Sequence, residues 1–149
     1  TVGQPSAREQ ATTIMPDDVQ LRKIHEEWGF SQAIVAGDTV YVSGVVIGAP
    51  RDGSNLQAAY EEGFARIGDI LKRAGSSWDD VVEITSYHTD LTSQMPTMIE
   101  VKHRYVKAPF PAWTAIEVSR LIPDRGITEI KVTAHLAART RGDTPRPRK

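Results

Sequence analysis

The sequence predicts a single α/β domain: a mixed sheet in the order ββαβαββ with two helices on one face. The chain has 149 residues, 40% of them hydrophobic, which suits one domain with a substantial core and is short for two. Runs rich in β-branched residues alternate with two runs of helical period. No internal repeat or interdomain linker is visible. We expect the domain at residues 19–138, between an N-terminal arm, 1–18, and a basic C-terminal tail, 139–149.

The two ends of the chain lack the apolar pattern of a core. The arm is rich in Ser, Thr, Gln and Pro, and its composition leaves open a mobile arm or an ordered flap. The tail interleaves arginines with Gly and Pro. We interpret it as a solvated tail in preference to an anion-binding arm.

The first two strands are predicted at residues 31–36 and 39–47, joined by the turn Gly37-Asp38. Strict alternation along the second strand places apolar residues on both of its faces, so we expect a central strand. One face would carry Val40, Val42 and Val46, and the other Tyr41, Val45 and Ile47.

The clearest helix is predicted at residues 55–74, where apolar residues recur every three or four positions. Ser54 is expected to cap its start in a capping box, and Gly75 suits the left-handed residue that closes it. On its solvent face, Glu62 with Arg66 and Asp69 with Arg73 have the spacing of ion pairs.

A strand at residues 81–89 and a shorter helix are predicted to follow. Thr92 or Ser93 could cap that helix, with Pro96 in its first turn. Its narrow apolar stripe consists of Met98, Val101 and Tyr105.

Two strands complete the sheet. Pro109 and Pro111 direct the chain into an extended segment, 109–118, with Trp113, Ala115 and Glu117 on one face. In the last strand, 128–136, apolar residues alternate with polar ones that include Glu129 and Lys131. Two helices can cover only one face of such a sheet, so we expect a second copy of the chain to cover the other.

Composition and spacing exclude several classes of function. A formal net charge of −1 gives no field that would attract nucleic acid or an anionic membrane. The absence of cysteine excludes disulfides, thiolate metal sites and cysteine nucleophiles, and the four histidines are scattered. No phosphate loop or Gly-x-Ser-x-Gly motif is present, and no apolar run reaches about 18 residues. We expect no metal, no cofactor, no membrane span and a cytoplasmic protein.

Four short motifs occur in order between Gly29 and Leu136. They are Gly29-Phe30-Ser31-Gln32-Ala33, Tyr41-Val42-Ser43-Gly44, Ala74-Gly75-Ser76-Ser77-Trp78-Asp79-Asp80-Val81-Val82 and Thr128-Glu129-Ile130. Together they resemble the YjgF/RidA family of reactive intermediate deaminases, also known as L-PSP endoribonucleases. Each motif is weak alone, but their common order makes chance agreement improbable. The resemblance implies a chorismate-mutase-like homotrimer with clefts between subunits.

Two positions depart from the pattern of the deaminases in this family. In those deaminases the resemblance implies an arginine at the position of Trp113, which binds the substrate carboxylate. The indole of Trp113 offers only one hydrogen-bond donor and a π-face in its place. Phe30 replaces a tyrosine of the first motif. The chain resembles a branch of the family that lacks this arginine. The segments His88-Thr89-Asp90 and Val101-Lys102 are also similar to the sequences of that branch. The ligand implied is a small metabolite, aromatic or uncharged.

The resemblance implies one catalytic candidate and a set of binding candidates. Glu129 matches the glutamate that positions the attacking water, although a structural ion pair beside Lys131 is the alternative. Trp113 is either core or pocket wall, and we favour the wall. Lys102 could replace the missing cation, although a solvated lysine is the ordinary interpretation, and His88 is more often a structural strand histidine. The substrate-binding set is Trp113, Phe30, Ser43, Gly44, Ala115, His88 and Lys102.

Three functions remain open from the sequence. The first is an enzyme that hydrolyses an enamine, imine or related reactive metabolite, but not 2-aminoacrylate. The second is a trimer that binds or senses a small molecule without turnover. The third, an endoribonuclease or translation inhibitor, is disfavoured, because the chain lacks the basic stripe and stacking platform that RNA binding requires.

Overall fold

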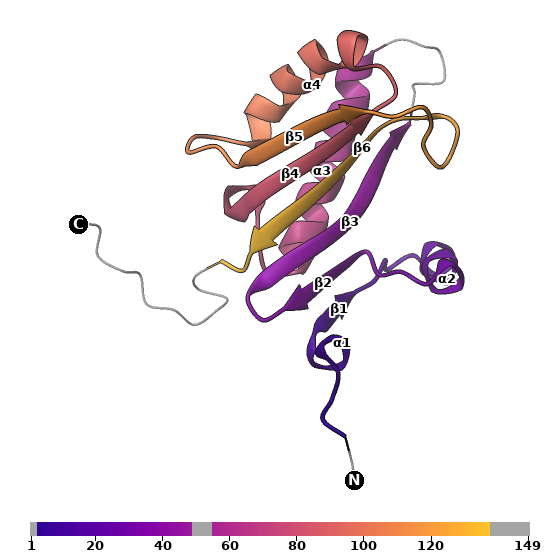
Figure 1. Ribbon diagram of the computed structural model, residues 1–149, viewed down its shortest axis with the longest axis vertical. Helices are drawn as coiled ribbons and strands as arrows, with labels where there is room; N and C mark the ends of the chain where they lie inside the picture. The colour runs from indigo at the N-terminus through magenta and orange to yellow at the C-terminus, as the bar shows by residue number, and fades with distance from the viewer. Residues whose placement is uncertain (1–2, 49–54, 138–149) are drawn as a thin grey trace, which may run out of the picture.

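One six-stranded mixed sheet organises the molecule, in the spatial order β1-β2-β3-β6-β4-β5 (Figure 1). The computed structural model describes residues 3–48 and 55–137. The strands are β1 (Thr12–Ile14), β2 (Ala33–Ala36), β3 (Thr39–Gly48), β4 (Val81–His88), β5 (Ala112–Glu117) and β6 (Gly126–His135). The helices are α1 (Ala7–Gln10), α2 (Val19–Trp28), α3 (Leu56–Arg73) and α4 (Leu91–Tyr105), with a 3₁₀ turn at Trp78–Asp80.

The predicted α/β class and the order of its seven elements are confirmed. Helix α3 joins β3 to β4, which both run antiparallel to β6, and α4 joins β4 to the parallel strand β5. Both connections are therefore crossovers between parallel strands. In Figure 1 α3 and α4 lie together behind the sheet, and the face toward the viewer carries no helix of the described chain.

Three elements near the N-terminus were not predicted, and the first of them is the short helix α1 inside the expected arm. Strand β1 lies inside the expected arm and pairs antiparallel with β2, which extends the sheet. Helix α2 begins after Asp18, whose side chain accepts a hydrogen bond from the backbone N–H of Leu21, and ends at Gly29 with φ +78°. A capping aspartate and a left-handed glycine are ordinary helix boundaries.

The expected facing of residues along β3 is wrong in its second half. The pairing register with β6 shifts between Val42 and Val45, which marks a β-bulge at Ser43 and Gly44. The extra residue returns Val45 and Ile47 to the core face, so both are buried with Val42. The strand is therefore apolar mainly on its helix side, and the argument for a covering second copy is weaker than strict alternation implied.

Helix boundaries differ from the predictions for local reasons. Asn55 caps α3 by accepting from the backbone N–H of Ala58, while the predicted cap Ser54 lies outside the described residues. Gly75 follows α3 with φ +88°, as expected. At α4 the predicted caps Thr92 and Ser93 are wrong, because the cap is Asp90, one residue before the helix.

Of the two ion pairs predicted on α3, one forms. Glu62 and Arg66 lie 3.3 Å apart. Arg73 instead donates to the Gln32 side chain at 2.9 Å and lies 3.4 Å from Asp17. The pair with Asp69 is therefore wrong, and Arg73 ties α3 to the segment that precedes α2.

The hydrophobic core lies between the sheet and the helix pair. Its largest fully buried side chains from the helices are Tyr60, Phe64, Ile67, Leu71, Met98 and Val101. Gly63 permits close contact with the sheet, because a Cβ there would lie 2.6 Å from Ile47 Cδ1. None of the helices in the described residues is long and apolar enough to cross a membrane.

Candidate functional site

Glu129 lies on the face of the sheet that the helices leave open. Its neighbours in β6, Thr128 and Ile130, are fully buried on the helix side, so alternation directs Glu129 the other way. The side chain is half-buried, and burial raises the pKa of its carboxyl above the usual value. Within residues 3–48 and 55–137 no cationic side chain lies within 4.0 Å of this carboxylate, Lys131 included.

The bulge in β3 makes room for this carboxylate. A Cβ on Gly44 would lie 2.7 Å from both Cδ and Oε2 of Glu129. Any larger residue at this position would have to displace the carboxylate. Gly44 is therefore required by the position of Glu129, which is a physical reason for the Ser43-Gly44 sequence at the bulge.

A groove of about 820 Å³ adjoins this region and runs between α2, α3 and β3. Phe30, Ser43 and Gly44 line it, so three of the predicted binding residues share one cavity. The Phe30 ring stacks on His25 with centroids 4.2 Å apart, and the Ser43 hydroxyl donates to the Ser31 carbonyl at 2.7 Å. A volume of this size accommodates a small-molecule ligand.

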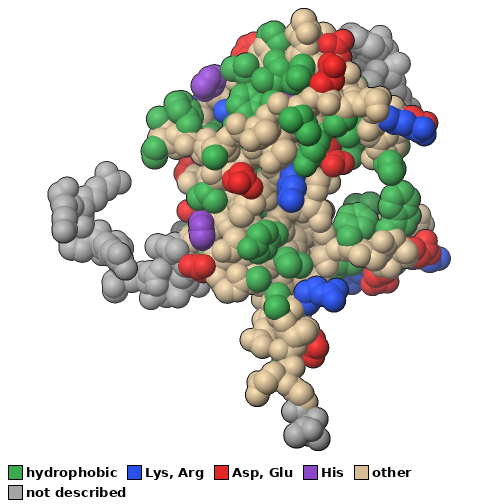
Figure 2. All heavy atoms as spheres, viewed as in Figure 1, with side chains coloured by type: hydrophobic (Ala, Val, Ile, Leu, Met, Phe, Trp, Pro, Cys, Tyr) green, Lys and Arg blue, Asp and Glu red, His purple; other side chains and the backbone are tan. Residues whose placement is uncertain are grey.

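Helix α2 supplies a wall of the groove that the sequence interpretation missed. Leu21, Ile24 and Trp28 line the cavity and are exposed, Trp28 by 64% of its surface. Their spacing of three and four residues, between a capping Asp18 and Gly29, was the available signal. In Figure 2 the apolar side chains of this lobe gather beside a hollow in the surface.

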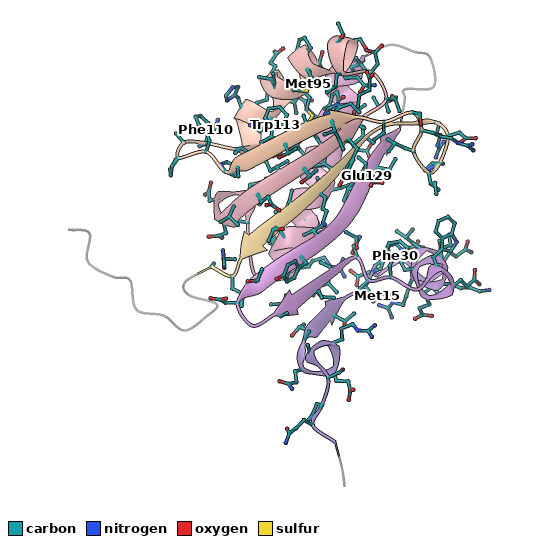
Figure 3. All side chains as sticks on the ribbon, viewed as in Figure 1. Met15, Phe30, Met95, Phe110, Trp113 and Glu129 are labelled. Carbon is teal, nitrogen blue, oxygen red and sulfur yellow. The ribbon has the colours of Figure 1, made fainter. Side chains whose placement is uncertain are left out.

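Trp113 lies on the opposite, helix-facing side of the sheet. Its indole Nε1 donates to Ser86 Oγ at 2.9 Å, and its half-buried ring packs against the core. Lys102 of α4 covers the ring, with Nζ 4.6 Å from the ring centroid. Lys102 is therefore not on a solvated face, and Ala115 follows Trp113 on the same face of β5. Figure 3 shows Trp113 beside α4 at the start of β5.

His88 belongs to a buried chain of hydrogen bonds behind the sheet. Its Nε2 lies 2.8 Å from Ser86 Oγ, and its Nδ1 lies 3.4 Å from Thr128 Oγ1. Thr128 in turn lies 2.7 Å from the Tyr60 hydroxyl. His88 is fully buried, and burial lowers its pKa despite a hydrogen bond with Gln94. The imidazole is therefore a neutral member of this hydrogen-bond network and lies out of reach of a ligand at the surface.

The predicted site residues thus form two groups within one chain. Phe30, Ser43 and Gly44 line the groove, and Glu129 lies against Gly44. Trp113, Ala115, His88 and Lys102 lie on the other side of the sheet. Within one chain, therefore, Glu129 and Trp113 do not face a common pocket. In the part of the chain that the structure describes, no group of three or more His, Asp or Glu side chains could hold a metal ion.

The sequence and fold were compared with known proteins. The family described as Endoribonuclease L-PSP matches residues 21–136. The chain belongs to this family. It is 36% identical over 118 residues to the RutC family protein YjgH of Escherichia coli, covering 76% of this chain and 87% of that relative. It is 32% identical over 109 residues to a 2-iminobutanoate/2-iminopropanoate deaminase of Bos taurus, covering 70% and 78%.

The fold is likewise that of the L-PSP family. The crystal structure of Rv2704 from Mycobacterium tuberculosis, a member of the YjgF/YER057c/UK114 family, superposes with a TM-score of 0.72 at 25% identity. The match covers 85% of this chain and 99% of that one. The family resemblance carried by the four motifs is confirmed. Several relatives, among them the Bos taurus and Homo sapiens proteins, are named 2-iminobutanoate/2-iminopropanoate deaminase, whereas others, such as the E. coli protein, are named by family alone.

Proposed function

We propose that this protein hydrolyses the C=N bond of a small imine or enamine, with water activated by Glu129. The observation that carries the proposal is the state of that carboxyl: half-buried, unpaired within the described chain, and with its pKa raised by burial. Such a group can take a proton from an attacking water and pass it to departing ammonia. Two findings support the proposal: the chain belongs to the Endoribonuclease L-PSP family, and a relative from Bos taurus is named as an imine deaminase.

We further propose that the working site lies between subunits of a homotrimer. Glu129 and Trp113 lie on opposite faces of the sheet, so a ligand that touches both needs Trp113 from a neighbouring chain. The uncovered face of the sheet is available for that contact. Light scattering at micromolar concentration is expected to give the mass of three chains. A monomeric mass would contradict the shared site.

The substrate class proposed here differs from the 2-imino acids of the named deaminases. Trp113 and Phe30 offer ring faces, and the resemblance implies an arginine and a tyrosine at these two positions in the deaminases. An aromatic or uncharged imine fits ring faces better than a small charged one. The test is ammonia release from imines generated in place by an amino-acid oxidase, with aromatic and small aliphatic amino acids compared. No acceleration with any of them would favour a trimer that binds ligand without turnover.

The rate of this reaction should depend on the protonation of Glu129. Because burial raises its pKa above the ordinary value of 4.5, the base is lost to protonation at a higher pH than for an exposed glutamate. The rate of ammonia release is expected to fall as the pH decreases, with its acid limb above pH 4.5. A rate that stays constant down to that pH would exclude Glu129 as the base.

A further inference from the structure

Lys102 is a largely buried residue whose ammonium group has no carboxylate partner within the described chain, while its Nζ keeps some contact with solvent. It lies in the last turns of α4 with 7% of its surface exposed. No carboxylate of residues 3–48 and 55–137 lies within 4.0 Å of its Nζ, and no described acceptor takes a hydrogen bond from it. Buried lysines are ordinarily paired, because transferring an ammonium ion out of water is costly.

Two aromatic rings surround this amine. Nζ lies 4.6 Å from the centroid of Trp113 and 5.9 Å from that of Phe110. Ring faces attract an ammonium ion, but less strongly than a carboxylate does. Burial correspondingly lowers the pKa of Lys102, which increases the fraction of neutral, nucleophilic amine near neutral pH.

The two rings differ in how tightly they are packed and in how much of each is exposed to solvent. Trp113 is held by its hydrogen bond to Ser86 and by the core. Phe110 lies in the connection between α4 and β5 and is 60% exposed (Figure 3). Phe110 is therefore the outer wall, and we infer that a ligand approaches Nζ from the side of this ring. A flat ligand on this path would stack on either ring.

We propose that Lys102 is a nucleophilic amine that captures small aromatic aldehydes as a covalent imine. The nitrogen lone pair adds to the carbonyl carbon and forms a C–N bond. The carbonyl oxygen then leaves as water, taking both amine protons, and the product is a C=N bond between the aldehyde carbon and Nζ. The aromatic ring of the aldehyde rests against Phe110 and Trp113.

This activity uses a different reacting group from the hydrolysis proposed for Glu129, although both proposals place Trp113 against the ligand. Lys102 lies on the helix side of the sheet and Glu129 on the open side. The capture of an aldehyde also consumes no water. The two proposals have different readouts, so their failures can be told apart: a Glu129→Gln protein is expected to lose ammonia release and still to be labelled at Lys102.

The test is reductive labelling of the full chain with benzaldehyde and cyanoborohydride at neutral pH, read by peptide mass spectrometry. The matched control is Lys107, an exposed lysine five residues along whose Nζ donates to the His103 carbonyl. Lys102 is expected to be labelled several-fold faster than Lys107 in the folded protein and at an equal rate in urea. Labelling of Lys102 at or below the rate of Lys107 in the folded protein would overturn the proposal.

Two variants sharpen this test. Lys102→Arg should remove the fast label while leaving Lys107 unchanged. Phe110→Ala should label faster at Lys102, because it both opens the path and removes a ring that stabilises the charged form. Slower labelling of Lys102 in the Phe110→Ala protein would contradict the role of Phe110 as the outer wall.

Discussion

Glu129→Gln is expected to reduce ammonia release from the preferred imine by roughly 100-fold or more, because a positioned general base contributes about 10²–10⁴-fold. Glutamine keeps the size and shape of the side chain beside Gly44 but cannot accept a proton. The assay is the coupled oxidase reaction, with initial rates corrected for spontaneous hydrolysis. Unchanged turnover in the variant would exclude the proposed role.

The stability of the same variant separates loss of catalysis from loss of fold. A raised pKa means that folded Glu129 binds its proton more tightly than unfolded Glu129, so the ionised carboxylate reduces the stability of the native state above its folded pKa. Glutamine removes this penalty. The variant is expected to be more stable than the wild type at neutral pH and equal to it well below pH 4.5, where the glutamate is protonated in both states. Denaturant unfolding at both pH values measures this, and light scattering checks the oligomer.

Such a trade between stability and activity is typical of catalytic groups. A carboxylate that is half-buried without a counterion costs stability and is retained where its protonation is used. The alternative ion pair with Lys131 would have lowered the pKa of Glu129, whereas the pKa is raised and the pair is absent from the described chain. This is the main reason to prefer the functional interpretation of Glu129.

The elements of the sheet and of the helix pair could be predicted because their signals are local. The helical period of α3 and the alternation of β6 both arise because each element buries one face. The buried residues can therefore be recognised from the sequence pattern alone. The bulge in β3 could not be predicted in this way. One extra residue at Ser43-Gly44 reverses the facing of Val45 and Ile47, and alternation alone does not reveal where the register changes.

The candidate site was harder to predict than the fold for a related reason. Glu129 and Trp113 are 16 positions apart on strands separated by β4, and sequence spacing does not say which face each occupies. Their faces depend on the register of β5 against β4, where Trp113 is paired with the buried Ile84. The burial of Lys102 depends likewise on the packing of α4 over β5. Such relations between elements are determined by tertiary packing, so the residue types were predictable but their grouping was not.

Phe64→Ala is expected to destabilise the fold by about 3–5 kcal/mol, the range for removing a buried phenylalanine. Phe64 is fully buried in α3, at the centre of the helix side of the core. Its ring stacks with Trp78 and Tyr105, with centroids 5.1 and 5.5 Å apart. Such ring pairs contribute roughly 0.5–1.5 kcal/mol beyond the area they bury. Urea unfolding monitored by circular dichroism measures the loss.

Phe110→Ala provides a matched control, because it removes the same side chain from a site that is 60% exposed. It should cost less than about 1 kcal/mol, since a surface substitution leaves no cavity. Both variants must be compared with the wild type at one protein concentration, because subunit association also contributes to the apparent stability.

The cost at Phe64 depends on whether Trp78 can move into the space left by the ring. The Nε1 of Trp78 donates to the Phe64 backbone carbonyl at 3.0 Å, and the substitution leaves this carbonyl in place. That hydrogen bond keeps the indole where it is, so the cavity should persist. A loss of unfolding free energy in Phe64→Ala no larger than that in Phe110→Ala would show that the aromatic cluster is not the centre of the core.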